Sequence, residues 1–359
     1  MLRVSFIIPC LNSAETLAAT LDGILASDLV PLEREIIVVD NGSQDDTVQI
    51  AKRYPVIVTS CERQCAGAAR NQGAKIATGE FLAFVDSDVV LETDWARELL
   101  SLFESGFYSA VLGRVIPAGS KTFLNEYRRA LNHRRYVGTN ISLFHSEGIG
   151  AVINTAACMY RRSTFLALGG FDERLKRLED TELSCRLFSI GGAFCATSKA
   201  RAHVTYAESV FSYVHRSFKL GQSKYPIVGL SRTSTSEALK ELTDELINQK
   251  VSMFTPEQKL FFWLNTLMSY LGFLCSLTQK KISPNAPPLH LGGKLISLFM
   301  LSSENRDYRL SSEGRILRVD EKLYFFSTKT GEWQDFKVDQ IPWEKLVGTG
   351  VLQQVTFVK

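Results

Sequence analysis

Two aspartates separated by a single serine stand where an apolar stretch of the sequence ends. Asp86 and Asp88 follow the continuous apolar run 81–85. Such a run is typical of a buried strand, whereas carboxylates are poor residues with which to fill a core. A hard divalent cation takes oxygen ligands and shares substrate phosphates when the protein supplies few ligands. The spacing therefore indicates a site where one carboxylate holds a metal ion and the other accepts a hydrogen bond from a ribose hydroxyl.

A further acidic side chain closes another strand-like run. Asp40 follows the run 35–39, and Asn41, Gly42 and Ser43 come directly after it. Two interpretations are open at this point. Asp40 could accept hydrogen bonds from a base or a sugar, or it could close an Asx-turn that caps the next helix.

A helix expected at 66–78 begins with small residues and carries Arg70 and Asn71. Small residues allow a helix N-terminus to approach an anionic ligand closely, and the guanidinium of Arg70 offers a rigid fork of donors. The alternative is a glycine- and alanine-rich helix that packs closely on the sheet, with Arg70 in solvent.

Three acidic residues occur close together at Glu179, Asp180 and Glu182. Their charges repel one another. Acidic residues favour the first turn of a helix, so a solvated helix start is one interpretation. The other is that one of the three is a positioned general base.

The elements that must position these residues alternate between two periodicities. Short, nearly all-apolar strands separated by helices predict a parallel sheet covered on both faces. In such a sheet the ligand lies at the carboxyl ends of the strands, near a topological switch point. Strands are expected at 4–8, 35–39, 56–59, 81–85 and 110–115, and helices at 14–25, 46–54, 66–78 and 95–104.

The composition is that of an ordinary globular protein. The chain has 359 residues, 45% of them hydrophobic and 22% charged, which excludes a disordered or collagen-like protein. Its length suits about two domains. A formal net charge of +3 does not predict a nucleic-acid partner. The seven cysteines are scattered and lie mostly in apolar runs, which indicates a reducing, cytosolic compartment.

The sequence changes character after residue 230. The run 260–277 has no charged residue, and its length is at the lower edge for a membrane span. A helix there could pack against protein, lie in a bilayer interface or span a membrane. Its polar or small residues fall on one helical stripe, formed by Asn265, Ser269, Gly272 and Ser276.

The C-terminal tail shows a period of two, which is typical of strands. Strands are expected at 315–319, 322–327, 333–338 and 351–358. They predict a small β-rich module that needs a surface on which to dock in order to be very stable.

Five segments occur in an order that carries a family resemblance: VSFIIPCLN, VVDNGSQDDT, GAARNQGAKIATGEFLAFVDSDV, RRSTFLALGGFDE and EDTELSCRL. Together, over roughly residues 3–225, they resemble the inverting glycosyltransferases of family 2, which have the GT-A fold. The resemblance implies an α/β protein with an open, mostly parallel sheet and helices on both faces. In this chain a helical segment and a small C-terminal β module would follow.

The resemblance implies a site for a nucleotide-diphosphate sugar, with a UDP-sugar as the favoured donor. The residues that it assigns to the nucleotide sugar are Pro9, Asn12, Asp40, Arg70, Asn71 and Asp86. Asp86 is expected near the ribose and Asp88 on a Mn²⁺ or Mg²⁺ ion, whose site His203 would complete. A structural histidine beside a strand is the alternative for His203.

The resemblance also implies a catalytic base, Asp180. The acceptor side is expected to comprise Gly170, Phe171, Asp172 and Glu179. The glycines of this loop would allow a sharp turn close to the sugar, although a simple turn is the alternative. Asp180 would take the proton of an acceptor hydroxyl as it attacks the anomeric carbon in a single inverting displacement, while the metal bridges the two phosphates.

The sequence therefore predicts a metal-dependent inverting glycosyltransferase in three parts. These are a GT-A domain at 1–230, a helical extension at 231–305 that could be membrane-interfacial, and a β-rich module at 306–359. A catalytically inactive sugar-nucleotide-binding protein is an alternative, which the complete acidic set disfavours. A nucleotidyltransferase is another, but it would need a basic, glycine-rich loop where residues 9–12 stand.

The partners are less defined. The acceptor could be a saccharide, a lipid-linked molecule or a peptide, and no nucleic acid is expected. The expected location is the cytoplasm, including the inner face of the membrane. Peripheral membrane contact and a homo-oligomer are both open.

Overall fold

The computed structural model describes most of the chain up to residue 278 and a set of strands beyond it. The described residues are 3–29, 33–105, 108–119, 121–133, 141–144, 153–189, 194–205, 208–230, 254–278, 301–303, 306–310, 314–319, 322–327, 332–337 and 352–355.

The first half of the large sheet is wholly parallel, as the apolar runs predict. Its strands lie in the order β3-β2-β1-β4. In the β1–β2 register Cys10 lies opposite Asp40, so these two strands end at the same edge of the sheet. The strands are β1 (Arg3–Cys10), β2 (Glu33–Asp40), β3 (Ile57–Ser60) and β4 (Phe81–Val85). The helices between them are α1 (Leu17–Leu25), α2 (Thr47–Ala51) and α3 (Ala66–Ile76).

The second half of the sheet is mixed. β8 (Ala157–Arg161) runs antiparallel between β4 and β6 (Ala110–Pro117). β9 (Phe194–Val204) is parallel to β6, and β5 (Val89–Leu91) and β7 (Ile141–Phe144) pair with β9 in antiparallel fashion. The sheet is therefore open, with its parallel half first, and the predicted α/β architecture is confirmed.

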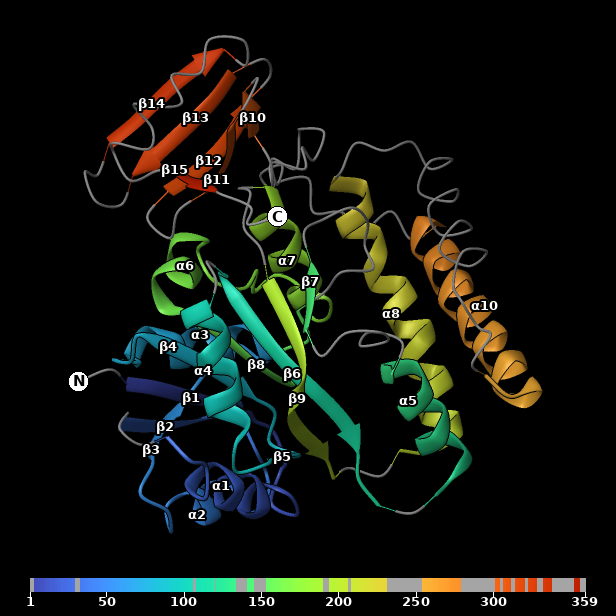
Figure 1. Cartoon of the computed structure of the whole chain (residues 1–359). Helices are drawn as coiled ribbons and strands as arrows, with labels where there is room; N and C mark the ends of the chain where they lie inside the picture. The colour runs from blue at the N-terminus through green and yellow to red at the C-terminus, as the bar shows by residue number, and fades with distance from the viewer. Residues whose placement is uncertain are drawn as a thin grey trace.

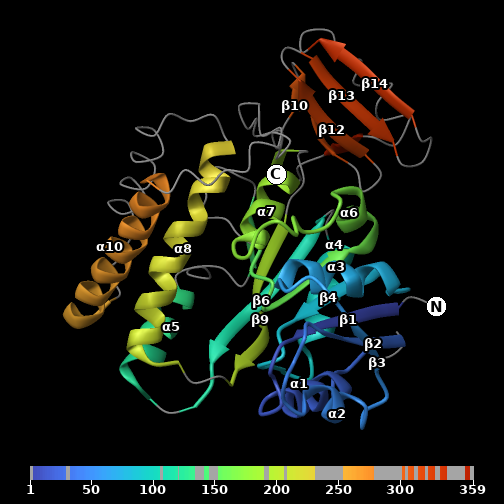
Figure 2. The same ribbon diagram turned by 180° about the vertical axis from the view of Figure 1, so that it is seen from behind.

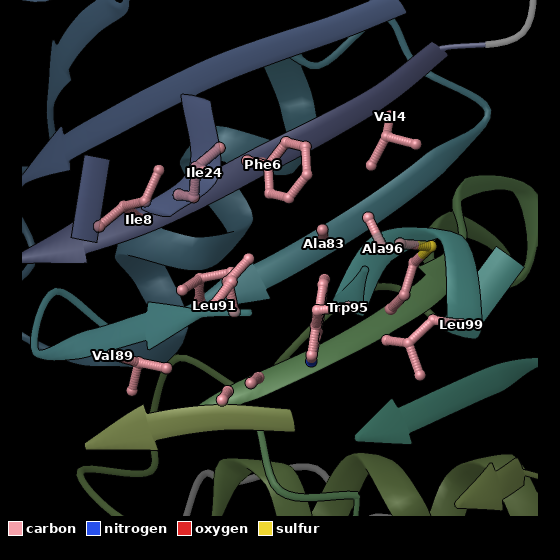
Figure 3. Close-up of a cluster of buried hydrophobic side chains, with 14 of the residues drawn as sticks. Val4, Phe6, Ile8, Ile24, Ala83, Val89, Leu91, Trp95, Ala96 and Leu99 are labelled. Carbon is pink, nitrogen blue, oxygen red and sulfur yellow. The ribbon is translucent and has the colours of Figure 1, made fainter. Parts of the chain in front are cut away.

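Helices cover both faces of this sheet because successive strand side chains point to opposite sides. On β1, Phe6 and Ile8 face α1, α2 and α4 (Trp95–Ser105), as Figure 3 shows for the residues around Trp95. Ile7 faces the other way, toward α3, α6 (Arg162–Ala167) and α7 (Glu179–Ser189). Two apolar layers thus fix the strand ends from which the polar side chains project.

Three further helices lie beside the sheet: α5 (Phe123–His133), α8 (Val210–Leu230) and α10 (Pro256–Thr278). α8 and α10 run side by side in both views (Figures 1 and 2). The Ser217 hydroxyl donates to Asn265 Oδ1 at 3.1 Å, and a Cβ on Gly272 would collide with the carbonyl oxygen of Phe218. Asn265 and Gly272 of the predicted small-residue stripe therefore face α8. Among the described helices, α10 included, none is both long and apolar enough to cross a lipid bilayer.

The C-terminal strands form two three-stranded antiparallel sheets, drawn in orange and red in Figure 1. One contains β10 (Leu301–Ser303), β11 (Arg306–Leu310) and β15 (Leu352–Val355). The other contains β12 (Gly314–Val319), β13 (Lys322–Ser327) and β14 (Glu332–Lys337). The strands predicted from the period of two are confirmed. The division of the chain into three parts stays a prediction.

Candidate active site

The loops that follow β1 and β2 are tied together at the carboxyl edge of the sheet. The backbone N–H of Asn12 donates to Ser43 Oγ at 2.9 Å, and Asn12 Oδ1 accepts from the N–H of Gln44 at 2.8 Å. Asn12 is one of two described non-glycine residues with positive φ, at 51°. Pro9 lies opposite Val39 in the register of the two strands. The loop pair forms one rim of the candidate site.

Asp40, at the end of β2, forms the Asx-turn that was one of its two interpretations from the sequence. Its carboxylate accepts the N–H groups of Gly42 and Ser43, each at 3.2 Å. The side chain is half-buried. An Asx-turn therefore shapes this rim, and the nucleotide-binding role of Pro9, Asn12 and Asp40 stays a prediction.

Arg70 on α3 lies at the centre of the candidate site. Its side chain is 5% exposed, and its Nη1 and Nη2 atoms donate to Glu179 Oε1 and Asp86 Oδ1, both at 2.7 Å. The guanidinium also lies 5.7 Å from the centre of the Phe171 ring. Burial alone would lower the pKa of Arg70, but the charges of Asp86 and Glu179 outweigh it and raise the pKa. The alternative of an Arg70 in solvent is wrong, because Arg70 joins the end of β4 to the start of α7.

Asn71, next to Arg70, holds the glycine loop. Its Nδ2 donates to the Phe171 carbonyl oxygen at 2.9 Å and to Glu173 Oε1 at 3.0 Å. Its Oδ1 accepts the Phe171 N–H at 2.8 Å. Gly170 in this loop has a φ of +72°, in the left-handed region that favours glycine. The side-chain amide of Asn71 is thus engaged by the loop, and its predicted contact with the nucleoside is untested.

The two residues after Gly170 have different surroundings. The Phe171 ring is buried, with its centre 5.4 Å from that of Phe84. The Asp172 carboxylate pairs with Arg174 at 2.7 Å, and this hydrogen bond lowers the pKa of Asp172. The ring belongs to the core of the sheet, which anchors the loop. The predicted role of Gly170, Phe171, Asp172 and Glu179 on the acceptor side stays a prediction.

Asp180 lies in the first turn of α7. The preceding Leu178 has a φ of +63°, a strained conformation for a bulky residue. The N–H of Thr181 donates to Asp180 Oδ1 at 2.7 Å. Burial raises the pKa of Asp180 to about 6, with the charge of Glu179 acting in the same direction and Arg70 acting against both. A carboxyl group with such a pKa is suited to accept a proton near neutral pH.

Asp88 lies beside the end of β9. Its carbonyl oxygen accepts the N–H of Thr205 at 2.8 Å and the hydroxyl of the same residue at 2.9 Å. Burial raises the pKa of Asp88, and so does the neighbouring charge of Asp86, whereas Arg128 and Arg216 lower it. The two carboxylates of the motif are therefore close enough to repel each other, and cations from α5 and α8 act on the second.

His203, on β9, contacts a carboxylate that the sequence analysis did not single out. Its Nε2 lies 2.9 Å from Glu92 Oε1, and Arg201 Nε lies 3.0 Å from Glu92 Oε2. In the register of β5 and β9, His203 is opposite Val90, two residues beyond Asp88. In the part of the chain that the structure describes, no three His, Cys, Asp or Glu side chains are grouped to hold a metal. The metal role of His203 is untested.

Two charged residues near the candidate site, Glu92 and Arg216, were not predicted. Glu92 and Arg216 belong to no motif, and no signal in the sequence points to them. Arg128 belongs to a basic cluster in the sequence, formed by residues 127–129 and 133–135, for which two interpretations are open: a solvated helix face, or contact with a phosphate or an anionic lipid surface.

The fold and the acidic strand ends define an α/β protein of the GT-A type. The family model for glycosyl transferase family 2 matches residues 5–168, which include the ends of β1, β2 and β4. Through that segment the chain is similar to glycosyl transferase family 2.

Curated relatives agree with this similarity. The O-antigen chain rhamnosyltransferase WbaN of Salmonella anatum is 33% identical over 185 residues, covering 48% of this chain and 57% of that protein. The O-antigen chain rhamnosyltransferase RfbN of Salmonella typhimurium is 27% identical over 214 residues, covering 57% of this chain and 68% of that protein. The chain thus spans between about half and two thirds of the length of these relatives.

A solved structure shows the same fold. The mannosyltransferase PcManGT from Pyrobaculum calidifontis, in complex with GDP-Man and Mn²⁺, superposes with a TM-score of 0.53 at 16% identity. The match covers 78% of this chain and 88% of that one.

Proposed function

We propose that this protein is a metal-dependent inverting glycosyltransferase that moves a sugar from a nucleotide-diphosphate sugar to an acceptor hydroxyl. The observation that supports this most is the double ion pair of Arg70, which brings Asp86 and Glu179 to one guanidinium. Asp86 belongs to the acidic pair after β4, and Glu179 directly precedes the proposed base, Asp180. The donor and the base can therefore meet at one rim of the sheet.

The proposed reaction is a single displacement. The acceptor oxygen forms a bond to the anomeric carbon, the bond from that carbon to the phosphate oxygen breaks, and the nucleoside diphosphate leaves. Asp180 takes the proton of the acceptor hydroxyl. Its pKa of about 6 means that it is mostly ionised at pH 7 and above, yet basic enough to accept the proton.

Asp88 is the proposed protein ligand of a Mn²⁺ or Mg²⁺ ion. Its half-buried carboxylate is the hard oxygen donor that these ions prefer. His203 is the proposed second ligand, through the ring nitrogen that Glu92 does not engage. With so few protein ligands, the remaining positions suit phosphate oxygens and water. When bound, such an ion neutralises negative charge on the diphosphate leaving group.

The relatives support a narrower choice of substrates. Both curated relatives described above are named rhamnosyltransferases of O-antigen chains. We therefore propose a saccharide acceptor, and rhamnosyl donors should be included first in any screen. A UDP-linked donor is the expectation from the sequence, and GDP- and dTDP-linked sugars are the comparison.

The test is the release of nucleoside diphosphate from UDP-, GDP- and dTDP-sugars by the full chain, with and without Mn²⁺. Wild-type protein should release the diphosphate from one class of donor. Asp180→Asn should abolish transfer and leave nucleotide binding largely intact. Asp88→Ala should remove both activity and metal dependence, and Asp22→Ala, which changes an exposed carboxylate on α1, should do neither.

Three outcomes would reject the proposal or a part of it. Binding of sugar nucleotides without any turnover would indicate a catalytically inactive binding protein. Release of pyrophosphate from a nucleoside triphosphate would instead indicate a nucleotidyltransferase. Activity that survives in Asp180→Asn would show that Asp180 is not the base.

A further inference from the structure

Two helices outside the sheet bring arginines to the side of Asp88. The carbonyl oxygen of Asp88 accepts the N–H of Thr205, just beyond β9, and the carbonyl oxygen of Val204 accepts the N–H of Ala118, just beyond β6. Both bonds are 2.8 Å long. Asp88 is therefore hydrogen-bonded to the end of β9, and the end of β9 is hydrogen-bonded to the end of β6. α5 begins at Phe123, shortly after Ala118, and α8 begins at Val210, shortly after Thr205. The charges of Arg128 on α5 and Arg216 on α8 both act on Asp88.

Contacts on either side of Arg128 fix its place on α5. Arg129 Nη2 donates to the carbonyl oxygens of Pro117 and Gly119, at 3.0 and 3.2 Å, which holds α5 to the end of β6. The Tyr127 ring packs edge-on against Tyr213 of α8, with 5.9 Å between ring centres. The helix is thus held to both the sheet and α8.

Arg216 lies about one turn beyond Tyr213 on α8 and stacks on that ring, with its guanidinium carbon 4.9 Å from the ring centre. Its Nη2 pairs with Glu208 Oε2 at 2.9 Å, which neutralises part of its charge. The stacking and the ion pair hold the guanidinium of Arg216 in place on α8, and its charge acts on Asp88.

Arg128 differs from Arg216 in its partners. Its side chain is half-buried, and it makes no hydrogen bond or ion pair with any residue that the structure describes. A partly desolvated charge without a direct partner costs free energy. A guanidinium in that situation favours an anion, and its planar fork matches phosphate oxygens well.

We propose that Arg128, with Arg216 beside it, binds the diphosphate of the sugar nucleotide. This inference rests on the proposed function, since Asp88 would hold the metal on the same diphosphate. As the bond to the anomeric carbon breaks, the leaving phosphate oxygen gains negative charge. A guanidinium already in place stabilises that charge without reorganisation. Arg128 is the principal contact, because Glu208 already shares the charge of Arg216.

The test compares nucleoside diphosphates with monophosphates. Binding of UDP, GDP and dTDP, and of UMP, GMP and dTMP, is measured by calorimetry with Mn²⁺ on the full chain. Arg128→Gln should weaken the diphosphate that the wild type binds by roughly ten- to a hundredfold. The affinity for its monophosphate should change less than about twofold, because the contact is to the outer phosphate. Arg216→Gln should show the same selectivity with a smaller loss.

Two controls separate this effect from damage to the fold. Arg97→Gln removes an exposed arginine on α4 that pairs with Asp28, and it should leave both affinities unchanged. Arg128→Lys keeps the charge and should recover part of the diphosphate affinity.

Unchanged diphosphate affinity in Arg128→Gln would overturn the inference, and so would an equal loss for diphosphate and monophosphate. If the wild-type protein bound no nucleoside diphosphate at all, the proposed function itself would be rejected. If wild type and Arg128→Gln bound the diphosphate equally well, only the role of Arg128 would be rejected.

Discussion

Replacing Asp180 with asparagine should stabilise the fold at neutral pH, although it should abolish transfer. Burial and the charge of Glu179 raise the pKa of Asp180 from its ordinary value of 3.8 to about 6. A carboxyl group with a raised pKa holds its proton more tightly in the folded than in the unfolded chain, so ionising it lowers the stability of the fold. Asparagine keeps an oxygen that can accept the Thr181 N–H, and it carries no charge.

The pH range of the effect follows from the two pKa values. Between about pH 4 and pH 6 the unfolded chain loses this proton while the folded chain retains it, so wild-type stability falls as the pH rises. Above about pH 6 the cost is complete. One pKa unit corresponds to about 1.4 kcal/mol, so a shift of about two units gives roughly 3 kcal/mol. For a folded unit of this size, that is a rise in Tm of about 5–10 °C.

The assay is thermal and urea unfolding of wild type and Asp180→Asn at pH 4 and pH 7.5. The variant should be more stable at pH 7.5 by about 2–3 kcal/mol, and the difference should shrink toward zero at pH 4. Asp172→Asn is a control of opposite sign, because the hydrogen bond from Arg174 lowers the pKa of Asp172, so neutralising it should lower stability at pH 7.5. If Asp180→Asn were no more stable than wild type while Asp172→Asn behaved as expected, the raised pKa of Asp180 would be refuted.

Two glycine substitutions test the close contacts of the fold. Gly170→Ala combines a φ of +72° with a collision against the Asn71 side chain, so it should cost about 1–3 kcal/mol in urea unfolding and reduce kcat. Gly169→Ala has a φ of +82° but open space around its Cβ, so a loss as large as that of Gly170→Ala would contradict the collision. Gly272→Ala would press against the backbone of α8 and should also cost about 1–3 kcal/mol, whereas Leu267→Ala, at an exposed position, should cost much less. Equal losses of stability in Gly272→Ala and Leu267→Ala would argue against close packing of α8 and α10.

The parallel half of the sheet could be predicted from the sequence because its strands are nearly unbroken apolar runs. The run 81–85 coincides with β4 from end to end. β5 could not be predicted in the same way, since three residues show no period, and it forms only by pairing with β9, distant in the chain. The change from β8 to α6 has no local signal, because β8 ends at Arg161 and α6 begins at Arg162 with no glycine or proline between them.

In the candidate site, too, residues in local motifs could be predicted, whereas contacts between residues far apart in the chain could not. The motifs identified the acidic residues at the strand ends, because a carboxylate after an apolar run stands out in any sequence. The surroundings of Arg70 could not be predicted, since its partner Glu179 is 109 residues away and no local pattern reports that contact. For Asp40 the local alternative could be recognised in advance, because an Asx-turn is made by neighbouring residues.

The ion pairs of Arg70 make the strength of the proposed base and the integrity of the site depend on one side chain. The guanidinium lowers the pKa of Asp180, against burial and the charge of Glu179, which raise it. It also neutralises Glu179 and Asp86, at 2.7 Å each. Without it, Glu179 would be left as a buried, unpaired charge, which is strongly destabilising, and the Asp180 carboxyl would become harder to ionise. A lysine would restore the charge but not the planar fork that reaches both carboxylates at once. The end of β4 and the start of α7 are therefore held in one arrangement, in which the acidic pair and the proposed base keep a fixed relation before any substrate binds.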